Sequence, residues 1–192
     1  MSQSTEIKCF GNVATDATTV KFAGTRSIVF DGTDDYLDVG DIRYGSGDFT
    51  VEGWFNFQVT NVTQELIGRY NTSNSQGWEL IYASPSIYFQ TNAGSNNTGF
   101  VNWAPTIGQW YHIAAVRSGT NKYLFIDGTL QSGFPINIGT GELTGESTGT
   151  VKIGTRLDLS TDFNGYMQDV RITKGLARYT SNFTPPTTEL EG

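Results

Sequence analysis

Residues 48–58, Asp-Phe-Thr-Val-Glu-Gly-Trp-Phe-Asn-Phe-Gln, decide the fold class. Successive side chains of an extended chain point to opposite faces, so every second residue shares a side. One side collects the apolar residues Phe49, Val51, Phe55 and Phe57. The other side collects the polar residues Thr50, Glu52, Asn56 and Gln58. This alternation predicts a β-strand with one face in an apolar core.

Similar segments recur along the chain between clusters of Gly, Asn and Ser, which are typical of turns. The clearest lie at 26–30, 36–39, 64–70, 77–83, 86–91, 110–117, 122–127, 150–154 and 165–173. No ten-residue stretch has the period of an amphipathic helix, and only 174–179 is typical of one helical turn. The pattern predicts an all-β fold of two antiparallel sheets, packed as a sandwich or jelly roll.

The composition fits one domain of 192 residues, with 23 Gly and a formal net charge of −7. We expect residues 1–22 to form an N-terminal arm or edge strand and residues 23–192 to form the domain. An acidic surface repels phosphate backbones, so nucleic acid is excluded as a partner. The first residues have no apolar signal-peptide core, and no apolar run is long enough to span a bilayer. Cys9 is the only cysteine, so no intrachain disulfide is expected.

Four stretches, in this order, resemble the laminin G-like domains of the concanavalin A-type lectin/glucanase superfamily. They are 27–32 with 34–37, 49–55, 108–117 with 124–128, and 153–154 with 163–172. The resemblance implies a concanavalin A-like two-sheet jelly roll, and a role in recognising glycans or proteins, often beside a calcium ion. Some superfamily members are glycoside hydrolases, so the fold alone leaves the activity open.

The ending at 173–186, which contains Arg178, Tyr179 and Phe183, resembles the versions of this domain found in bacteriophage tail fibres and head decorations. That narrower resemblance implies a virion or extracellular surface as the location, with other virion proteins as partners. Arms and tails often mediate assembly, so a homo-oligomer is also expected.

The sequence lacks the residue patterns of catalysis. A glycosidase needs two carboxyl groups about 5–9.5 Å apart, and superfamily glucanases place them as Glu-x-Asp-x-x-Glu on one strand. No such string occurs: residues 48–58 offer only Glu52 inside the strand, and 165–173 offer only Asp169. His112, the single histidine, is interpreted as structural, since no Gly-x-Ser-x-Gly elbow accompanies it. The chain is therefore expected not to be an enzyme.

A calcium site is expected at the acidic residues near the first strong turn. Asp31 and Asp34 flank a glycine turn, and calcium prefers several oxygen ligands. Asp31 and Asp169 match positions that the family keeps acidic, and the first and last strands of a jelly roll are often neighbours. We expect Asp31, Asp34 and Asp169 to converge on a structural calcium. The alternative is that Asp31 caps its turn and that Asp169 pairs with Arg171 or a nearby amide.

A sugar site is expected around the polar loop 93–99 and the residues that follow it. Sugars stack on aromatic faces and hydrogen-bond to amides, so Trp103 with Asn102 is the strongest candidate. The proposed set is Trp103, Asn96, Asn97, Asn102, Trp78 and Tyr82, with Tyr88 on an adjoining strand. Each aromatic has a structural alternative: Trp103 as an anchor on the sheet edge, and Trp78, Tyr82 and Tyr88 as core. Trp54 and Trp110 match core positions of the family and are interpreted as scaffold.

Two functions follow. The first is a non-enzymatic, lectin-like module that binds glycan or cell-surface polysaccharide, favoured by the aromatic and amide-rich loop. The second is a structural or protein-interaction module of a virion with no sugar binding, favoured by the aromatic ending and the weakly patterned N-terminal segment.

Overall fold

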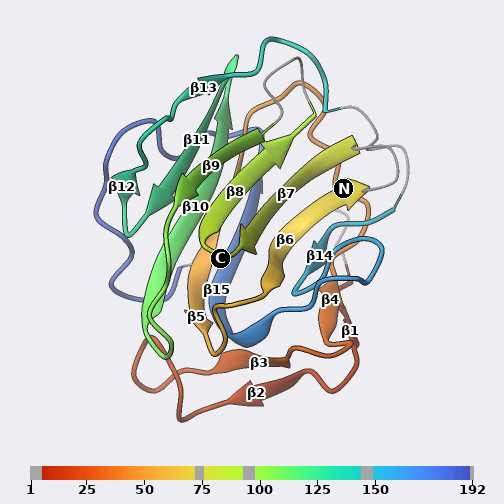
Figure 1. Ribbon diagram of the computed structural model, residues 1–192, viewed down its shortest axis with the longest axis vertical. Helices are drawn as coiled ribbons and strands as arrows, with labels where there is room; N and C mark the ends of the chain where they lie inside the picture. Colours follow the sequence, from red (N-terminus) through yellow and green to blue (C-terminus); the bar gives the residue numbers. More distant parts are fainter. Residues whose placement is uncertain (1–5, 72–75, 93–97, 144–148, 191–192) are drawn as a thin grey trace.

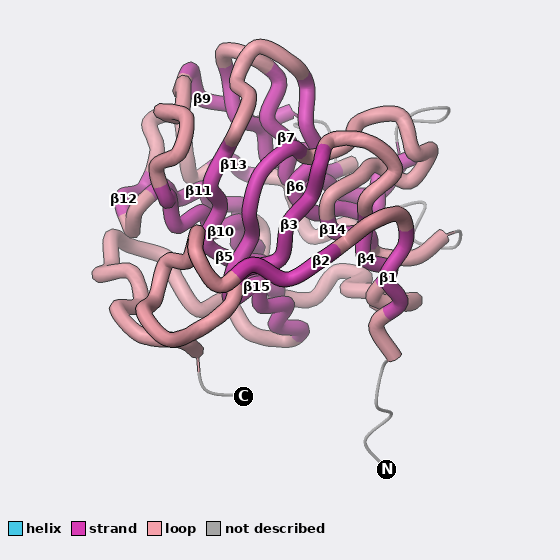
Figure 2. Tube along the Cα trace, turned by 90° about the horizontal axis from the view of Figure 1, so that it is seen from below, coloured by secondary structure: helices cyan, strands magenta, loops and turns pink. Residues whose placement is uncertain are grey.

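A computed structural model describes residues 6–71, 76–92, 98–143 and 149–190 and shows two antiparallel sheets packed as layers (Figures 1 and 2). The seven-stranded sheet runs in the order β1 (Lys8–Phe10), β4 (Tyr36–Asp38), β14 (Lys152–Ile153), β6 (Thr63–Asn71), β7 (Gln76–Ala83), β8 (Ser86–Thr91), β9 (Thr98–Asn102). The other sheet runs in the order β12 (Thr129–Leu130), β11 (Asn121–Ile126), β10 (Trp110–Ser118), β5 (Phe49–Phe57), β15 (Asn164–Lys174), β3 (Ser27–Asp31), β2 (Ala14–Asp16), and β13 (Ile136–Asn137) pairs with β11. The predicted all-β jelly-roll sandwich is confirmed.

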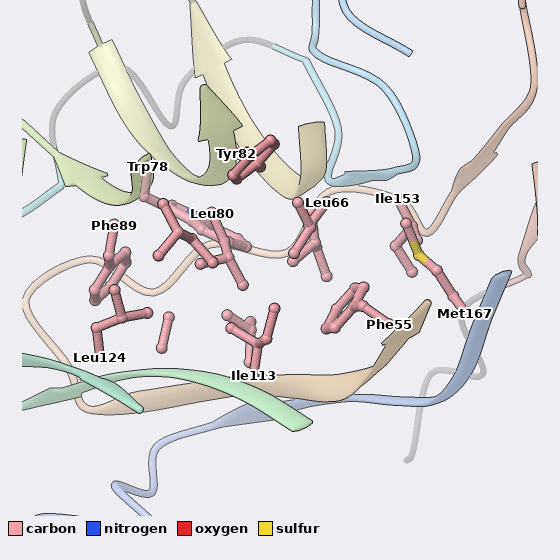
Figure 3. Close-up of a cluster of buried hydrophobic side chains, with 14 of the residues drawn as sticks. Phe55, Leu66, Trp78, Leu80, Tyr82, Phe89, Ile113, Leu124, Ile153 and Met167 are labelled. Atoms are coloured by element: carbon pink, nitrogen blue, oxygen red, sulfur yellow. The ribbon is translucent and has the colours of Figure 1, made fainter. Parts of the chain in front are cut away.

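Strand β5 lies at the centre of the eight-stranded sheet between β10 and β15. Its four predicted inward residues, Phe49, Val51, Phe55 and Phe57, are fully buried in the main core. Residues of the facing sheet, including Trp78, Leu80 and Phe89, pack against that layer (Figure 3). Fully burying one such side chain contributes about 1.5–3 kcal/mol, so this interface between the sheets dominates the stability of the fold.

Two local expectations are resolved by the backbone. Residues 174–179 do not form a helical turn, since β15 continues to Lys174 and the chain beyond it is irregular. Within 1–22, β1 and β2 are short edge strands, one on each sheet. None of the described residues lies in a helix, and so this part of the chain contains no helix able to span a bilayer.

Residues 175–190, called here the C-terminal strap, lie over the outer face of the eight-stranded sheet, the face turned away from the core. Tyr179 and Phe183 stack with ring centroids 3.6 Å apart and both contact Phe125 of β11. Together with Ala177 they cover a small apolar cluster of Ala114, Val116 and Phe125. The aromatic ending that suggested assembly thus packs on its own sheet.

A buried ion network lies beneath the strap and is centred on Glu52 of β5. Arg171 donates to Glu52 at 2.7 and 2.9 Å, and the Tyr179 hydroxyl donates at 2.8 Å. His112 is fully buried, and its Nε2 lies 3.3 Å from the same carboxylate. Burial opposes ionisation of Glu52, but the bonds from His112, Arg171 and Tyr179 outweigh it and lower the pKa. The network ties the strap to the sheet.

Replacement of Gly128 is expected to loosen the strap. Gly128 has φ of 73°, and a Cβ there would collide with the Phe183 carbonyl, whereas the Phe183 amide donates to the Gly128 carbonyl at 2.9 Å. Gly119 is a matched control, because its φ is 56° and a Cβ there meets nothing within 4 Å. Gly119→Ala should cost about 1–2 kcal/mol for the left-handed backbone alone. Gly128→Ala should cost at least about 1 kcal/mol more in urea unfolding; equal losses would mean that the strap is not clamped there.

Candidate functional site

The outer face of the seven-stranded sheet carries a polar row that crosses every strand. Directly paired residues share a face, and the register aligns seven of them in one line. In spatial order these are Lys8, Asp38, Lys152, Gly68, Glu79, Gln90 and Thr98. The row combines cationic donors, carboxylate acceptors, an amide and a hydroxyl. We call it the polar row.

Stacked aromatic pairs lie beside the polar row at both ends. Phe10 of β1 and Tyr36 of β4 stack with centroids 4.5 Å apart, and Tyr88 of β8 and Phe100 of β9 stack at 5.1 Å. Phe100 is 52% exposed, which is high for a large apolar residue. Four strand spacings separate β4 from β8, which is about 19 Å. The aromatic pairs therefore flank the two ends of the polar row, whose middle residues Lys152, Gly68 and Glu79 are buried.

A buried carboxyl pair occupies the middle of this face. Glu65 and Glu79 are fully buried and within hydrogen-bonding reach of each other. Gly68 makes room for them, because the Glu65 carboxylate lies where its Cβ would be. Burial, and then the charge of Glu79, raise the pKa of Glu65 well above its usual value. Burial also raises the pKa of Glu79, although Arg156 Nε donates to it at 3.0 Å. The two raised pKa values favour a proton held between the carboxyl groups.

Asp38 and Lys152 form the other charged part of the polar row. Lys152 Nζ lies 3.4 Å from Asp38 Oδ2 and 4.3 Å from the centre of the Tyr36 ring. Partial burial opposes ionisation of Asp38, but the bonds from Thr150, Gly40 and Lys152 lower its pKa. Asp38 thus stays an acceptor at neutral pH, beside an ammonium and an aromatic face. This arrangement suits a neutral ligand that both donates and accepts hydrogen bonds.

The predicted sugar residues do not assemble into one site. Trp78 and Tyr82 are wholly buried in the core, so their assignment to sugar binding is wrong. Both alternate with Glu79 and Ile81 on β7 and point inward. Tyr88 pairs with Ile81 and points outward.

Trp103 packs against the sheet edge, in line with its structural alternative. Its ring contacts Phe57, Tyr82 and Tyr111, and its amide donates to the Pro85 carbonyl at 2.9 Å. Asn102 is exposed and its side chain accepts from Ser86. Asn96 and Asn97 lie outside the described residues. Asn102 is the last residue of β9 and Trp103 follows it, whereas Asn96 and Asn97 precede this strand in the sequence.

The predicted calcium ligands are also separated. Asp31 pairs with Asn164, and Asp169 lies five residues further along β15, a separation of about 15 Å. The Asp31 carboxylate caps the Thr33 amide at 2.7 Å, and Asp169 accepts the Leu190 amide at 2.8 Å. Asp34 is exposed, with φ of 57°. Convergence of Asp31, Asp34 and Asp169 is thus wrong, and in the described part of the chain no three His, Cys, Asp or Glu side chains form a group able to hold a metal.

Sequence reasoning missed Glu65 and Glu79, because it sought paired carboxylates on one strand. The two residues come from neighbouring strands, and a bulge between Glu65 and Ile67 adjusts the register. A hairpin around the polar residues 71–76 would have placed both strands side by side. The carboxyl pair could therefore have been found only by pairing these two strands with each other.

The two packed sheets define a concanavalin A-like jelly-roll domain. The chain belongs to the laminin G-like family of the Concanavalin A-like lectin/glucanases superfamily, whose profile matches residues 31–177. No curated protein sequence matches the chain significantly.

Solved structures similar to the chain share its fold at low sequence identity. The binding domain of botulinum neurotoxin serotype G has a TM-score of 0.64 and 14% identity over 90% of this chain, which spans 44% of that domain's length. Domain 4 of AbnA, an extracellular arabinanase from Geobacillus stearothermophilus solved with arabinotriose, has a TM-score of 0.60 and 17% identity, covering 87% of this chain and 77% of that one. A heptameric pentraxin from Limulus polyphemus has a TM-score of 0.59 and 18% identity. The match covers 79% of this chain and 77% of the pentraxin chain.

Proposed function

We propose that the chain is a non-enzymatic module that binds neutral glycan or polysaccharide through the outer face of its seven-stranded sheet. The observation that carries this proposal is the polar row, aligned by the strand register between two stacked aromatic pairs. Sugars offer C–H faces to aromatic rings and hydroxyls to carboxylates, amides and ammonium groups. Lys8, Asp38, Gln90 and Thr98 present these groups, exposed or partly exposed, on a rigid sheet, whereas Lys152 and Glu79 are buried.

The state of the carboxyl pair supports binding without hydrolysis. A hydrolytic pair needs carboxyl groups about 5–9.5 Å apart around the scissile bond. Glu65 and Glu79 are instead in mutual contact, fully buried, with Arg156 against Glu79. A sugar cannot lie between them. The arabinotriose complex of the AbnA domain adds support, because a domain of this fold is seen there with an oligosaccharide.

Loss of the Tyr88–Phe100 pair is expected to abolish most of the binding. Tyr88→Ala and Phe100→Ala should each weaken affinity for a bound oligosaccharide by about tenfold or more, as expected for an aromatic anchor. Calorimetry with arabinotriose and short oligomers of glucose, galactose and N-acetylglucosamine measures this. Tyr123→Ala, which removes a half-buried tyrosine from the opposite sheet, is the matched control. Equal affinity in wild type and Tyr88→Ala would place the ligand elsewhere.

Membership of a virion, location on an extracellular surface and binding of calcium are further proposals. We propose display on a virion or extracellular surface, where polysaccharide is available, and calorimetry with and without a chelator tests a calcium requirement. The alternative is a virion interaction module with no sugar binding. The aromatic ending at 173–186 no longer favours it, because Ala177, Tyr179 and Phe183 pack on the chain's own sheet. Sedimentation analysis tests the expected homo-oligomer.

A further inference from the structure

A groove on the opposite sheet is lined by two tryptophans, one buried and one partly exposed. Trp54 of β5 and Trp110 of β10 both lie on the outer face of the eight-stranded sheet. Trp54 is buried there, in line with its interpretation as scaffold, whereas Trp110 is partly exposed. They line a hollow of about 570 Å³ together with Lys21, Phe22, Asp127 and residues 184–187. A second hollow of about 640 Å³ shares Lys21, Phe22 and Thr187 and continues past Thr25 and Glu189. We call the two hollows the tryptophan groove.

Both walls of the tryptophan groove are held in place. On one side, Lys21 and Thr25 are bridged by the buried side chain of Gln168, which accepts the Lys21 amide at 2.8 Å and donates to the Thr25 hydroxyl at 2.6 Å. On the other side, the C-terminal strap is anchored at Gly128 and at Asp169. A preformed groove binds with less ordering cost than a flexible one.

The floor of the groove combines aromatic and charged groups. Lys21 Nζ lies 3.7 Å from the centre of the Trp54 ring, which leaves the half-exposed Trp110 as the open aromatic surface. Asp127 lies at the rim, where its Oδ1 accepts the His112 amide at 2.9 Å. The groove therefore presents a ring for C–H groups, an ammonium donor, a carboxylate acceptor and the hydroxyls of Thr184 and Thr187.

The charges decide which ligand fits. Asp127 and Glu189 in the groove, together with the net charge of −7, repel nucleic acid and other polyanions. A wholly apolar ligand would remove Lys21 and Asp127 from water without replacing their hydrogen bonds, at an energetic cost. A neutral, polyhydroxylated chain satisfies both charges and stacks on Trp110. The volumes of the two adjoining hollows suit several sugar units.

We infer that the tryptophan groove is a second binding site for neutral oligosaccharide, which makes the chain bivalent for glycan. It lies on the sheet opposite the polar row, and it stands whether or not the polar row binds sugar. Two sites on opposite faces let one molecule link two polysaccharide chains, and linked binding strengthens attachment without new contacts.

Titration of ¹⁵N-labelled protein with arabinotriose and the same panel of neutral oligosaccharides tests the groove. The expected result is a shift of the Trp110 indole N–H signal, with the buried Trp78 signal as an internal control. Trp110→Ala and Lys21→Met should each weaken this binding, Trp110→Ala by about tenfold. Lys21→Met keeps the aliphatic stem on Trp54 while removing the ammonium. Trp103→Phe, outside the groove, should leave it unchanged.

The outcomes separate the two proposals. Shifts at Trp110 that survive Tyr88→Ala establish the groove as an independent site. Shifts confined to β8 and β9 would overturn the groove and leave the proposed function standing. Shifts confined to Trp110 would establish the groove and overturn the polar row as the site. No shift with any sugar of the panel would overturn both.

Discussion

Lys122→Met is expected to stabilise the protein at pH 6 by between about 2 and 4 kcal/mol. Lys122 of β11 is fully buried, and its Nζ donates to the Phe89 carbonyl at 2.9 Å. Burial lowers the pKa of this lysine from 10.5 to about 7. Each unit of pKa shift corresponds to about 1.4 kcal/mol, and the lost hydrogen bond takes back about 1 kcal/mol. Methionine fills a similar volume without a charge.

The pH dependence identifies the cause. The unfolded chain holds the Lys122 proton up to pH 10.5, whereas the folded chain releases it near pH 7. The unfolded state thus binds more protons between these values, so the stability of the wild type rises with pH across this window. Chemical unfolding of both proteins from pH 6 to 10 measures the slope. Lys122 would be buried without an electrostatic penalty if wild type and Lys122→Met had the same dependence of stability on pH. The same would follow if Lys122→Met were less stable than the wild type at pH 6.

Glu65→Gln is expected to stabilise the protein at pH 8 by more than about 1 kcal/mol. With both carboxyls ionised, three of the four oxygens of Glu65 and Glu79 have no hydrogen-bond donor among the described residues. Glutamine imitates protonated Glu65, and its amide supplies the missing donor. Because the pKa of Glu65 is raised by burial and by Glu79, the folded state holds a proton that the unfolded state has released above pH 4.5. The stability of the wild type should therefore fall as pH rises above 4.5.

Two controls make the Glu65 result specific. Near pH 4 the wild type and Glu65→Gln should have similar stability, since the carboxyl is then protonated in both states. Glu6→Gln, at an exposed residue near the N-terminus, should change stability by less than about 0.5 kcal/mol at either pH. Destabilisation by Glu65→Gln at pH 8 would contradict the raised pKa of Glu65 as the cause.

The fold could be predicted because the strands carry strong period-two patterns. Residues 48–58 place four apolar side chains on one face, and the structure buries all four. The same period places Trp54 on the face opposite to that of Phe55, so the outward direction of Trp54 could be predicted from the sequence. On β7 the pattern is ambiguous, because Ile81 on the outer face is as apolar as Trp78 and Tyr82 on the inner face. That ambiguity led to the wrong assignment of two core aromatics.

The site could not be predicted because it depends on strand pairing. The polar row takes single residues from seven strands, and none of these residues is unusual within its own segment. Its alignment follows from the register, which includes the short strand β14 between β4 and β6. The predicted calcium site failed for the same reason: the antiparallel register of β3 and β15 sets Asp31 opposite Asn164 rather than Asp169.

A glycan array probed with wild type and with a Tyr88→Ala, Phe100→Ala double variant tests the central claim most directly. The claim is that the outer face of the seven-stranded sheet binds neutral glycan. The predicted result is that the wild type binds at least one class of neutral glycan and that the double variant, folded by circular dichroism, binds that class at least about tenfold more weakly. No binding of the wild type to any neutral glycan, or equal binding of both proteins, would contradict the claim.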